Sequence, residues 1–327
     1  MGLLFKVPGV AGSAMRLMAA RAALAEVPAE LRSPVLPFIT GSVTSRTLGM
    51  YRRVFRRPAN PGPDVHTQDV VIFGAPSVRA LLTRPAGSTQ GRRAAVLHLH
   101  AGGTIMGSPG AEAQLSGQLA RELDALVVAP VYRLAPEHPF PAALDDAMTT
   151  LRWILDKSKQ LGVDPDRVAV VGASAGGCLS AAVAQRAHDE GITLCAQGLV
   201  YPMLDDRTAL HEDHGNRGRY LWTPRSNLFG WTAYLGRPPQ ESEAPQYSVP
   251  ARRSDLTGLP PAWIGVGDLD LFYDEAIAYA EALQAAGVPC ELVTVPGMYH
   301  GADLLAAKAP TMREFRRNLI DHLRKHL

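Results

Sequence analysis

From about residue 69 onward, short apolar runs alternate with longer stretches in which apolar residues recur at helical spacing. The short runs are bounded by Gly, Pro or charged residues, which is typical of strands buried inside a sheet. Because strands and helical stretches alternate, the pattern predicts a largely parallel sheet covered by helices. The predicted strands are Val70–Phe73, Val78–Thr83, Ala94–His100, Leu126–Tyr132, Val168–Gly172, Gln197–Tyr201, Trp263–Gly267 and Glu291–Val295.

The helical stretches between these strands have recognisable ends. Gly162, Gly191 and Gly287 stand where glycine commonly terminates a helix. The turn-forming Gly74–Pro76 separates the first two strands and predicts a hairpin, so we expect the chain to enter the sheet antiparallel. The predicted helices are Ala111–Leu123, Ala142–Leu161, Ala175–Glu190, Tyr273–Ala286 and Pro310–His326.

Two segments depart from this alternation. Residues 1–66 look helical and then Pro-rich, and residues 205–246 mix charged residues with aromatic ones. Long excursions of this kind in a compact domain are usually functional, so we expect both to form a lid over a catalytic domain made of residues 67–204 and 247–327. Four aromatic residues of the insertion could either line a pocket or pack the lid together: Tyr220, Trp222, Phe229 and Trp231.

Composition narrows the range of partners. The 327 residues are 46% hydrophobic, which suits one large α/β domain with a modest appendage. Lys and Arg total 33 against 31 Asp and Glu, and a net charge of +2 offers no field suited to nucleic acid or an anionic membrane. We therefore expect a small, roughly neutral ligand and no nucleic acid.

Cysteine usage and hydropathy bear on the compartment. The three cysteines lie far apart and form no CxxC, which favours a reducing compartment, the cytoplasm, over a disulfide framework. Lys6, Pro8, Arg16 and Arg21 interrupt the apolar N-terminal stretch, so we expect no secretory signal. No run approaches the roughly 18 to 20 apolar residues of a membrane span, and we expect no stable membrane insertion.

The strongest chemical motif is a glycine-flanked serine, Gly172-Ala173-Ser174-Ala175-Gly176. Ser174 directly follows a predicted strand and opens an Ala-rich helix. This is the strand, turn and helix context of a nucleophile elbow, in which flanking side chains would collide with the neighbouring strand and helix. The context predicts an α/β-hydrolase fold with Ser174 as the nucleophile.

A serine hydroxyl needs a histidine base and a carboxylate that orients it, in the chain order serine, acid, histidine for this fold. His300 follows the last predicted strand, and Asp270 follows the strand before it. Asp268 and Asp274 crowd the same loop as Asp270, so spacing alone leaves the acid open, although Asp274 is typical of an acidic first helical turn.

The tetrahedral oxyanion needs backbone N–H donors. We expect Ala175, directly after the nucleophile, to supply one, and Gly102 and Gly103, directly after the predicted strand Ala94–His100, to supply the others. Glycines at these positions let the backbone approach the substrate closely.

Two histidine pairs resemble metal ligands, His98 with His100 and His211 with His214. Neither matches H-E-x-x-H, and no third ligand stands at a recognisable spacing. We expect no metal and no cofactor.

Several motifs together resemble the bacterial hormone-sensitive-lipase-like esterases of the α/β-hydrolase superfamily. The resemblance implies that the acid is Asp270, the first aspartate of a D-x-x-x-D-E pattern, and that the N-terminal helices and the insertion form a lid. Three departures stand out, because the family usually has Gly at Ala101, Asp at Ala173 and Phe at Ala302. The motifs are His100–Gly103, Tyr132–Pro141, Ser174–Gly177, Tyr201–Asp205, Gly258–Pro261, Asp270–Glu275 and His300–Gly301.

The resemblance implies a serine carboxylesterase that cleaves short- to medium-chain esters through an acyl-enzyme, with Ala302 leaving the pocket roomier. A homodimer through the last strand and helix would fit the family. Two alternatives stay open: a lactonase or amidase with the same triad, and a non-catalytic small-molecule-binding protein on the same fold. His300 argues against the second, because such proteins lack the catalytic histidine.

Overall fold

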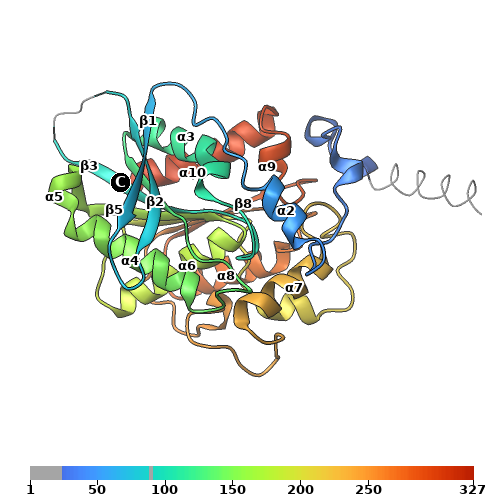
Figure 1. Cartoon of the computed structure of the whole chain (residues 1–327). Coiled ribbons are helices and arrows are strands. Elements are labelled where there is room, and N and C mark those ends of the chain that lie inside the picture. Colours follow the sequence, from blue (N-terminus) through green and yellow to red (C-terminus); the bar gives the residue numbers. More distant parts are fainter. Residues whose placement is uncertain (1–23, 88–90) are drawn as a thin grey trace, which may run out of the picture.

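The computed structural model describes residues 24–87 and 91–327, and an eight-stranded sheet forms its centre (Figure 1). The strand order is β1-β2-β4-β3-β5-β6-β7-β8. β2 runs antiparallel to both of its neighbours, and all other pairs are parallel, as the predicted antiparallel entry requires. The strands are β1 Val65–Ile72, β2 Val78–Pro85, β3 Arg93–Leu99, β4 Leu126–Pro130, β5 Val163–Ala173, β6 Ala196–Val200, β7 Ala262–Gly267 and β8 Cys290–Val295.

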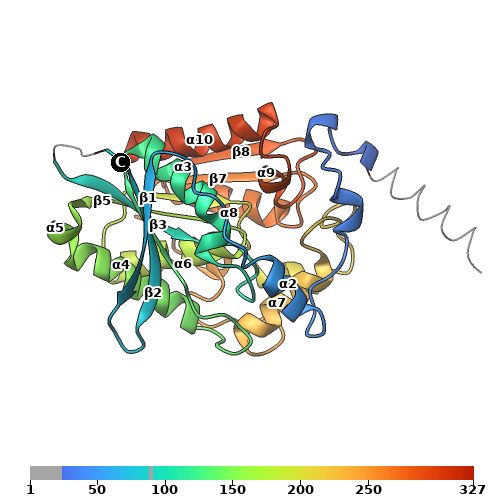
Figure 2. The ribbon, with the colours of Figure 1, turned by 45° about the horizontal axis from the view of Figure 1, so that its top comes forward.

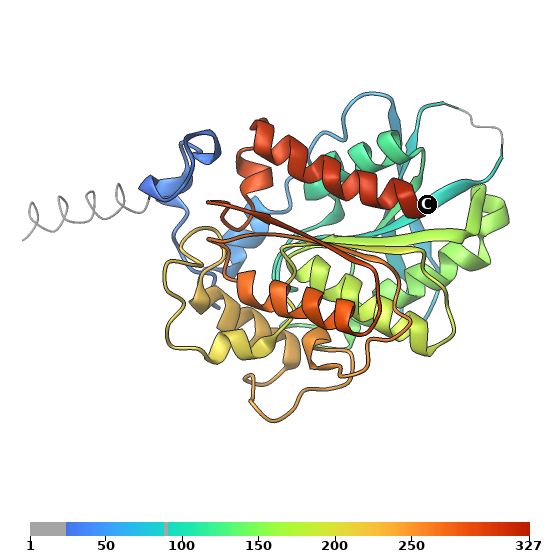
Figure 3. The ribbon, with the colours of Figure 1, turned by 180° about the vertical axis from the view of Figure 1, so that it is seen from behind.

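Helices cover both faces of the sheet. α3 (Ala113–Leu123) and α10 (Pro310–His326) lie on one face, while α4 (Ala142–Asp156), α6 (Ala175–Asp189) and α8 (Tyr273–Ala285) lie on the other (Figures 1 and 3). The remaining helices are α2 Leu48–Val54, α5 Ser158–Leu161, α7 Pro224–Leu235, α9 Ala302–Leu305, η1 Ala29–Leu31, η2 Leu36–Phe38, η3 Pro109–Glu112, η4 Asp206–Leu210 and η5 Pro250–Arg252. The predicted α/β class is confirmed.

All eight predicted strands are present, and the differences lie at element ends. β1 begins at Val65 rather than Val70, because its first half continues the pairing with β2. The single helix predicted over residues 142–161 was wrong: α4 ends at Asp156, and Lys157 has φ −99° and ψ 10°, so the chain restarts as the short α5.

The insertion contains a helix, α7, that periodicity does not reveal. The buried side chains of α7 include Asn227 and Ser226 as well as Trp231 and Tyr234, so no single apolar stripe marks it. Thr223 caps its first turn by accepting the Ser226 N–H. Polar residues that are buried by hydrogen bonding therefore hide this helix from a pattern based on hydrophobicity.

The two segments that break the alternation contact each other. Ser42 Oγ lies 2.8 Å from Thr223 Oγ1, and the Val43 N–H donates to Ser226 Oγ at 2.8 Å. The stretch that leads into α2 therefore contacts the first turn of α7 (Figure 2). The predicted lid segment 1–66 is described only from residue 24, so Lys6, Pro8, Arg16 and Arg21 lie outside the described residues. No helix of the described ranges is both long and apolar enough to cross a membrane.

Candidate active site

Ser174 occupies a sharp turn between β5 and α6. Its backbone has φ 56° and ψ −119°, a combination that is strained for a residue with a side chain. A Cβ on Gly172 would lie 2.2 Å from the Gly176 carbonyl oxygen, and one on Gly176 would lie 1.9 Å from the Leu99 carbonyl oxygen. Both flanking glycines are therefore required by close backbone contacts, as expected for an elbow.

Ser174, His300 and Asp270 form a continuous hydrogen-bonded line. His300 Nε2 lies 3.0 Å from Ser174 Oγ, and His300 Nδ1 lies 2.8 Å from Asp270 Oδ2. Asp270 is fully buried, and its Oδ1 accepts the Phe272 N–H at 2.9 Å. Because a carboxylate only accepts, Nδ1 carries the imidazole proton and Nε2 is left to accept the serine proton.

The structure separates the three crowded aspartates. Asp268 Oδ1 accepts the Gly297 N–H at 2.6 Å, which ties the loop after β7 to the loop after β8. Asp274 is an exposed residue of the first turn of α8 and pairs with Arg217. Of the three, Asp270 contacts His300.

Two aromatic rings hold the His300 imidazole, and sequence reasoning assigned no role to either. The Tyr201 ring packs edge-on at a centroid distance of 4.7 Å, and the Phe272 ring does so at 5.3 Å. The Tyr201 hydroxyl donates to Asp303 Oδ1 at 2.7 Å, and burial raises the pKa of Asp303. Both residues stand in motifs that carry the family resemblance, Tyr201–Asp205 and Asp270–Glu275, and these motifs were the signal in the sequence that could have pointed to them.

The loop after β3 is anchored through its carbonyl groups. The Tyr132 hydroxyl donates to the His100 carbonyl at 2.7 Å, and His100 Nδ1 lies 2.8 Å from the Ala101 carbonyl. The Gly102 carbonyl accepts from the N–H groups of Ile105 and Met106 at 3.1 and 3.0 Å. In a trans peptide the N–H points opposite to the C=O, so these bonds turn the Gly102 and Gly103 N–H groups the other way.

Those two N–H groups have no acceptor among the hydrogen bonds of the described residues. The Ala175 N–H is the first of α6 and therefore has no carbonyl one turn earlier in the helix. Gly102 and Gly103 have φ of 125° and 61°, which favour glycine, whereas Ala101 is not among the residues with positive φ. The departure at Ala101 therefore leaves the backbone unstrained.

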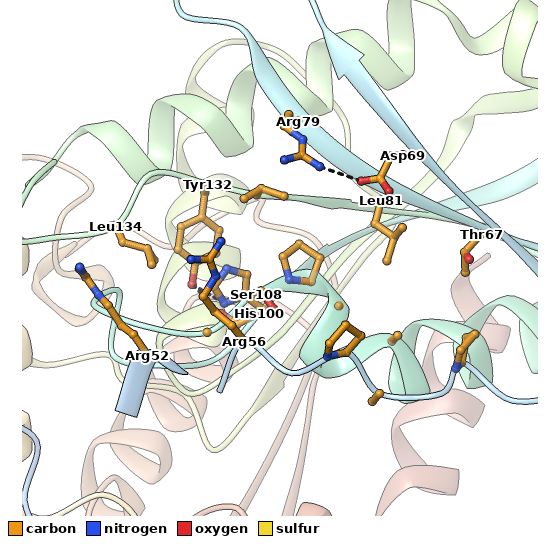
Figure 4. A pocket seen from close by; sticks show the side chains of 18 of the residues that line it. Arg52, Arg56, Thr67, Asp69, Arg79, Leu81, His100, Ser108, Tyr132 and Leu134 are labelled. Carbon is orange, nitrogen blue, oxygen red and sulfur yellow. Dashed lines mark hydrogen bonds and ion pairs between the residues drawn. The ribbon is translucent and has the colours of Figure 1, made fainter. Parts of the chain in front are cut away.

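His100 supports the loop as a neutral side chain. Burial lowers the pKa of His100 to about 4, so its Nδ1–H donates to the Ala101 carbonyl at neutral pH. The Tyr132 ring stacks on the His100 imidazole with centroids 4.0 Å apart, as Figure 4 shows from the side facing the larger cleft.

A cavity of about 90 Å³ contains Ser174 and His300. Trp222 is the one residue of the predicted pocket set that lines this cavity. Tyr220 instead packs edge-on against Tyr299, Trp231 and Ala302 are fully buried, and Phe229 packs against the core. Other wall residues come from α2 and its C-cap, the insertion, and α9 with its N-cap, and of these only Gly301 stood in a sequence motif: Tyr51, Phe55, Leu221, Gly301 and Leu304.

A larger cleft of about 680 Å³ lies on the other side of Gly107 and Ser108, which line both spaces (Figure 4). Charged side chains such as Arg52, Arg79 and Glu137 stand among its lining residues, and neither Ser174 nor His300 lines it. On its wall, Arg52 donates twice to Glu137 at 2.6 Å, and this pairing lowers the pKa of Glu137 to about 2. The smaller cavity, rather than the larger, is the candidate active site.

The histidine pairs do not form metal sites in the described residues. His100 is engaged with Ala101 and Tyr132, and His98 Nδ1 lies 2.8 Å from Ser116 Oγ. No group of three His, Cys, Asp or Glu side chains suited to a metal ion gathers within residues 24–87 and 91–327.

Comparison with known proteins agrees with this architecture. A family model described as the alpha/beta hydrolase fold matches residues 96–304, which is more than half of the chain. Esterase LipI of Mycobacterium tuberculosis is 34% identical over 262 residues, covering 79% of this chain and 81% of LipI. Carboxylesterase NlhH of the same species is 36% identical over 222 residues, covering 67% and 69%.

Solved structures give the same result over more of the chain. A bacterial heroin esterase superposes with a TM-score of 0.85 at 30% identity, covering 93% of this chain and 99% of the esterase. The matched residues of the family model span the elbow, the loop after β3 and the loops after β7 and β8. The chain therefore belongs to the alpha/beta-hydrolase-fold family, among its hormone-sensitive-lipase-like esterases.

Proposed function

We propose that this protein is a serine carboxylesterase that hydrolyses short- to medium-chain carboxylic esters, with Ser174, His300 and Asp270 as its triad. The observation that carries the proposal is the line of hydrogen bonds from Ser174 Oγ through His300 to Asp270, at 3.0 and 2.8 Å. It begins in the small cavity and ends in the protein interior. The relatives named esterase and carboxylesterase support the same reaction class.

The proposed reaction has two acyl-transfer steps. Ser174 Oγ attacks the ester carbonyl carbon while its proton passes to His300 Nε2, and Asp270 stabilises the imidazolium that forms. His300 then gives this proton to the leaving alcohol as the C–O bond breaks. Water, deprotonated by His300, attacks the acyl-enzyme and releases the acid.

The oxyanion of each tetrahedral intermediate is proposed to be bound by the N–H groups of Gly102, Gly103 and Ala175. Their support is that the first two are turned away from the anchored carbonyls and lack protein acceptors in the described residues. Preorganised donors of this kind typically contribute about 100- to 1000-fold each to kcat.

We propose that residues 1–66 and 205–246 act as the lid and set the substrate size. Support comes from the described part of both segments, because Tyr51 and Phe55 of α2 and Leu221 and Trp222 of the insertion line the cavity. A cavity of about 90 Å³ suits a short acyl chain better than a long one.

The test is hydrolysis of p-nitrophenyl acetate, butyrate and longer esters alongside lactones and anilides. Wild-type turnover should be highest on the short esters, and Ser174→Ala should abolish it. Asp270→Asn should lose about 10,000-fold in kcat, since the imidazole is left in the wrong tautomer. Asp268→Asn is the matched control and should lose far less. Wild-type turnover by Ser174→Ala would refute the mechanism, and a preference for lactones or anilides would change the reaction class.

We propose in addition a homodimer that pairs the β8 edges, and a location in the cytoplasm. The dimer is supported by β8, which ends the sheet and pairs only with β7 within the described residues. The location is supported by Cys178, Cys195 and Cys290, which are all free thiols, as is typical of a reducing compartment. Light scattering should give twice the chain mass, and Val293→Pro should shift it to the monomer. Cell fractionation tests the location.

A further inference from the structure

The oxyanion loop is held on one more side, by a carboxylate that none of the recognised motifs includes. Glu112, the last residue of η3, accepts the Ala101 N–H through Oε1 at 2.7 Å. Its Oε2 lies 3.2 Å from His98 Nε2, and its side chain is only 10% exposed. We propose that Glu112 is a positioning residue that fixes the first peptide of the oxyanion loop, and that His98 holds Glu112 in place. This inference rests on the proposed esterase function.

Glu112 completes the restraint of one peptide unit. The His100 carbonyl accepts the Tyr132 hydroxyl at 2.7 Å, and the Ala101 N–H of the same peptide donates to Glu112. This peptide leads directly into Gly102 and Gly103. Glycines do not restrict their own dihedral angles, so the direction of the donor N–H groups depends on bonds to neighbouring side chains.

His98, which contacts Ser116, packs against the Glu112 carboxylate. His98 lies on β3 with its side chain fully buried, and its Nδ1 is 2.8 Å from Ser116 Oγ on α3. Each imidazole nitrogen therefore faces one partner, Ser116 on one side and Glu112 on the other. A buried carboxylate is costly unless donors match it: the Ala101 N–H donates to Oε1, and the His98 imidazole lies 3.2 Å from Oε2 without forming a hydrogen bond.

This arrangement explains the His98 and His100 pair that the sequence presents as a possible metal motif. The two side chains support opposite ends of Ala101. His100 holds the Ala101 carbonyl directly, and His98 holds the carboxylate that binds the Ala101 N–H. Both histidine side chains are buried, and both support the same loop.

The position of Glu112 ties it to the reaction. Its side chain lines the cavity that contains Ser174 and His300. A displacement of about 1 Å in a catalytic donor can cost roughly 100-fold in rate. Loss of the Glu112 acceptor should therefore lower kcat, because the transition state is stabilised less. Ground-state binding of the ester, and hence KM, should change little.

The experiment compares Glu112→Ala and Glu112→Gln with wild type, using p-nitrophenyl acetate and a trifluoromethyl ketone that forms a tetrahedral adduct with the serine. Glu112→Ala should lower kcat by about 10- to 100-fold, with KM within about threefold, and should weaken the ketone by a similar factor. Glu112→Gln should restore most of the activity, because its amide oxygen can accept the same N–H. Glu122→Ala on α3, where Glu122 is exposed and bonded to Gln118, is the matched control and should change nothing.

Wild-type kcat and ketone affinity in Glu112→Ala would overturn the proposal. So would a Gln variant as impaired as the Ala variant, because the hydrogen bond would then not be the cause. If Glu112→Ala does not fold, Glu112→Asp provides the test, since its shorter side chain keeps the charge but withdraws the acceptor from Ala101. Ser174→Ala separates the two hypotheses: turnover that survives it refutes the esterase mechanism itself, whatever Glu112 does.

Discussion

Replacing Trp222 should lengthen the acyl chain that the enzyme accepts. The indole lies so close to the oxyanion loop that a Cβ on Gly103 would be 2.1 Å from Trp222 Cη2, and its Nε1 donates to Asn227 Oδ1 at 3.2 Å. Trp222 is therefore a fixed wall of the cavity that contains Ser174. Trp222→Ala removes this wall without touching the proposed triad.

The size of the effect follows from the cavity. Its volume of about 90 Å³ leaves room for a short acyl chain only. Each further methylene that leaves water contributes about 0.8 kcal/mol, or about fourfold in kcat/KM. Room for two more methylenes should raise the ratio of kcat/KM for hexanoate over butyrate by about 15-fold.

The assay is kcat/KM for p-nitrophenyl acetate, butyrate, hexanoate and octanoate, with thermal unfolding to confirm that each variant folds. Trp222→Leu should give an intermediate shift. Phe229→Ala is the matched control, because Phe229 belongs to the same insertion but does not line the cavity. An unchanged hexanoate-to-butyrate ratio in Trp222→Ala, or an equal shift in Phe229→Ala, would show that Trp222 does not limit chain length.

Three further outcomes test other parts of the structure. Gly176→Ala places a Cβ 1.9 Å from the Leu99 carbonyl oxygen. Urea unfolding should therefore show that the free energy of unfolding falls by about 1–3 kcal/mol or more, and esterase activity should be lost. Gly49→Ala is the control and should lose neither, because its Cβ would have no atom within 4 Å. The pKa of His100 is about 4 in the folded protein, so on acidification the unfolded state takes up this proton first. The free energy of unfolding should therefore fall by up to about 3 kcal/mol as the pH falls from about 6.5 to 4. Urea titrations at several pH values should show that His100→Gln lacks this loss. Arg52→Met should raise the pKa of Glu137 from about 2 toward its ordinary value, as carboxyl carbon NMR would measure.

The sheet and the candidate triad could be predicted because both depend on regular features of the chain. Apolar runs predicted the parallel strands β3 to β8, whereas the antiparallel β1 and β2 were recognised together with the turn between them, and β1 was predicted only in part. Ser174, Asp270 and His300 each follow such a strand, and the carboxyl ends of parallel strands meet at one edge. The choice of Asp270 needed the family pattern, because three aspartates share the loop and only side-chain direction distinguishes them.

The cavity walls could not be predicted in the same way. The insertion has no fixed period, so nothing in its sequence separates Trp222, which lines the cavity, from Trp231, which is buried in the core. Tyr51 lies in the short helix α2 and Phe55 directly follows it, in an Arg-rich segment. Only the fold brings these two residues to the cavity that Ser174 lines. Glu112 resembles an ordinary acid at a helix start, since its partner Ala101 is recognisable only in three dimensions.

This division locates reactivity and selectivity in different parts of the molecule. The proposed triad, the elbow and the anchored loop belong to the ends of β3, β5, β7 and β8, where each group has several partners. The walls belong to α2 and the insertion, which are linked to each other through contacts such as Ser42 with Thr223. A substitution in the walls should therefore change the ester that fits without changing the chemistry, whereas a substitution beneath the loop, as at Glu112, should slow every ester alike. Comparing Trp222→Ala with Glu112→Ala on one ester series tests this directly, because only the first should change the order of preference.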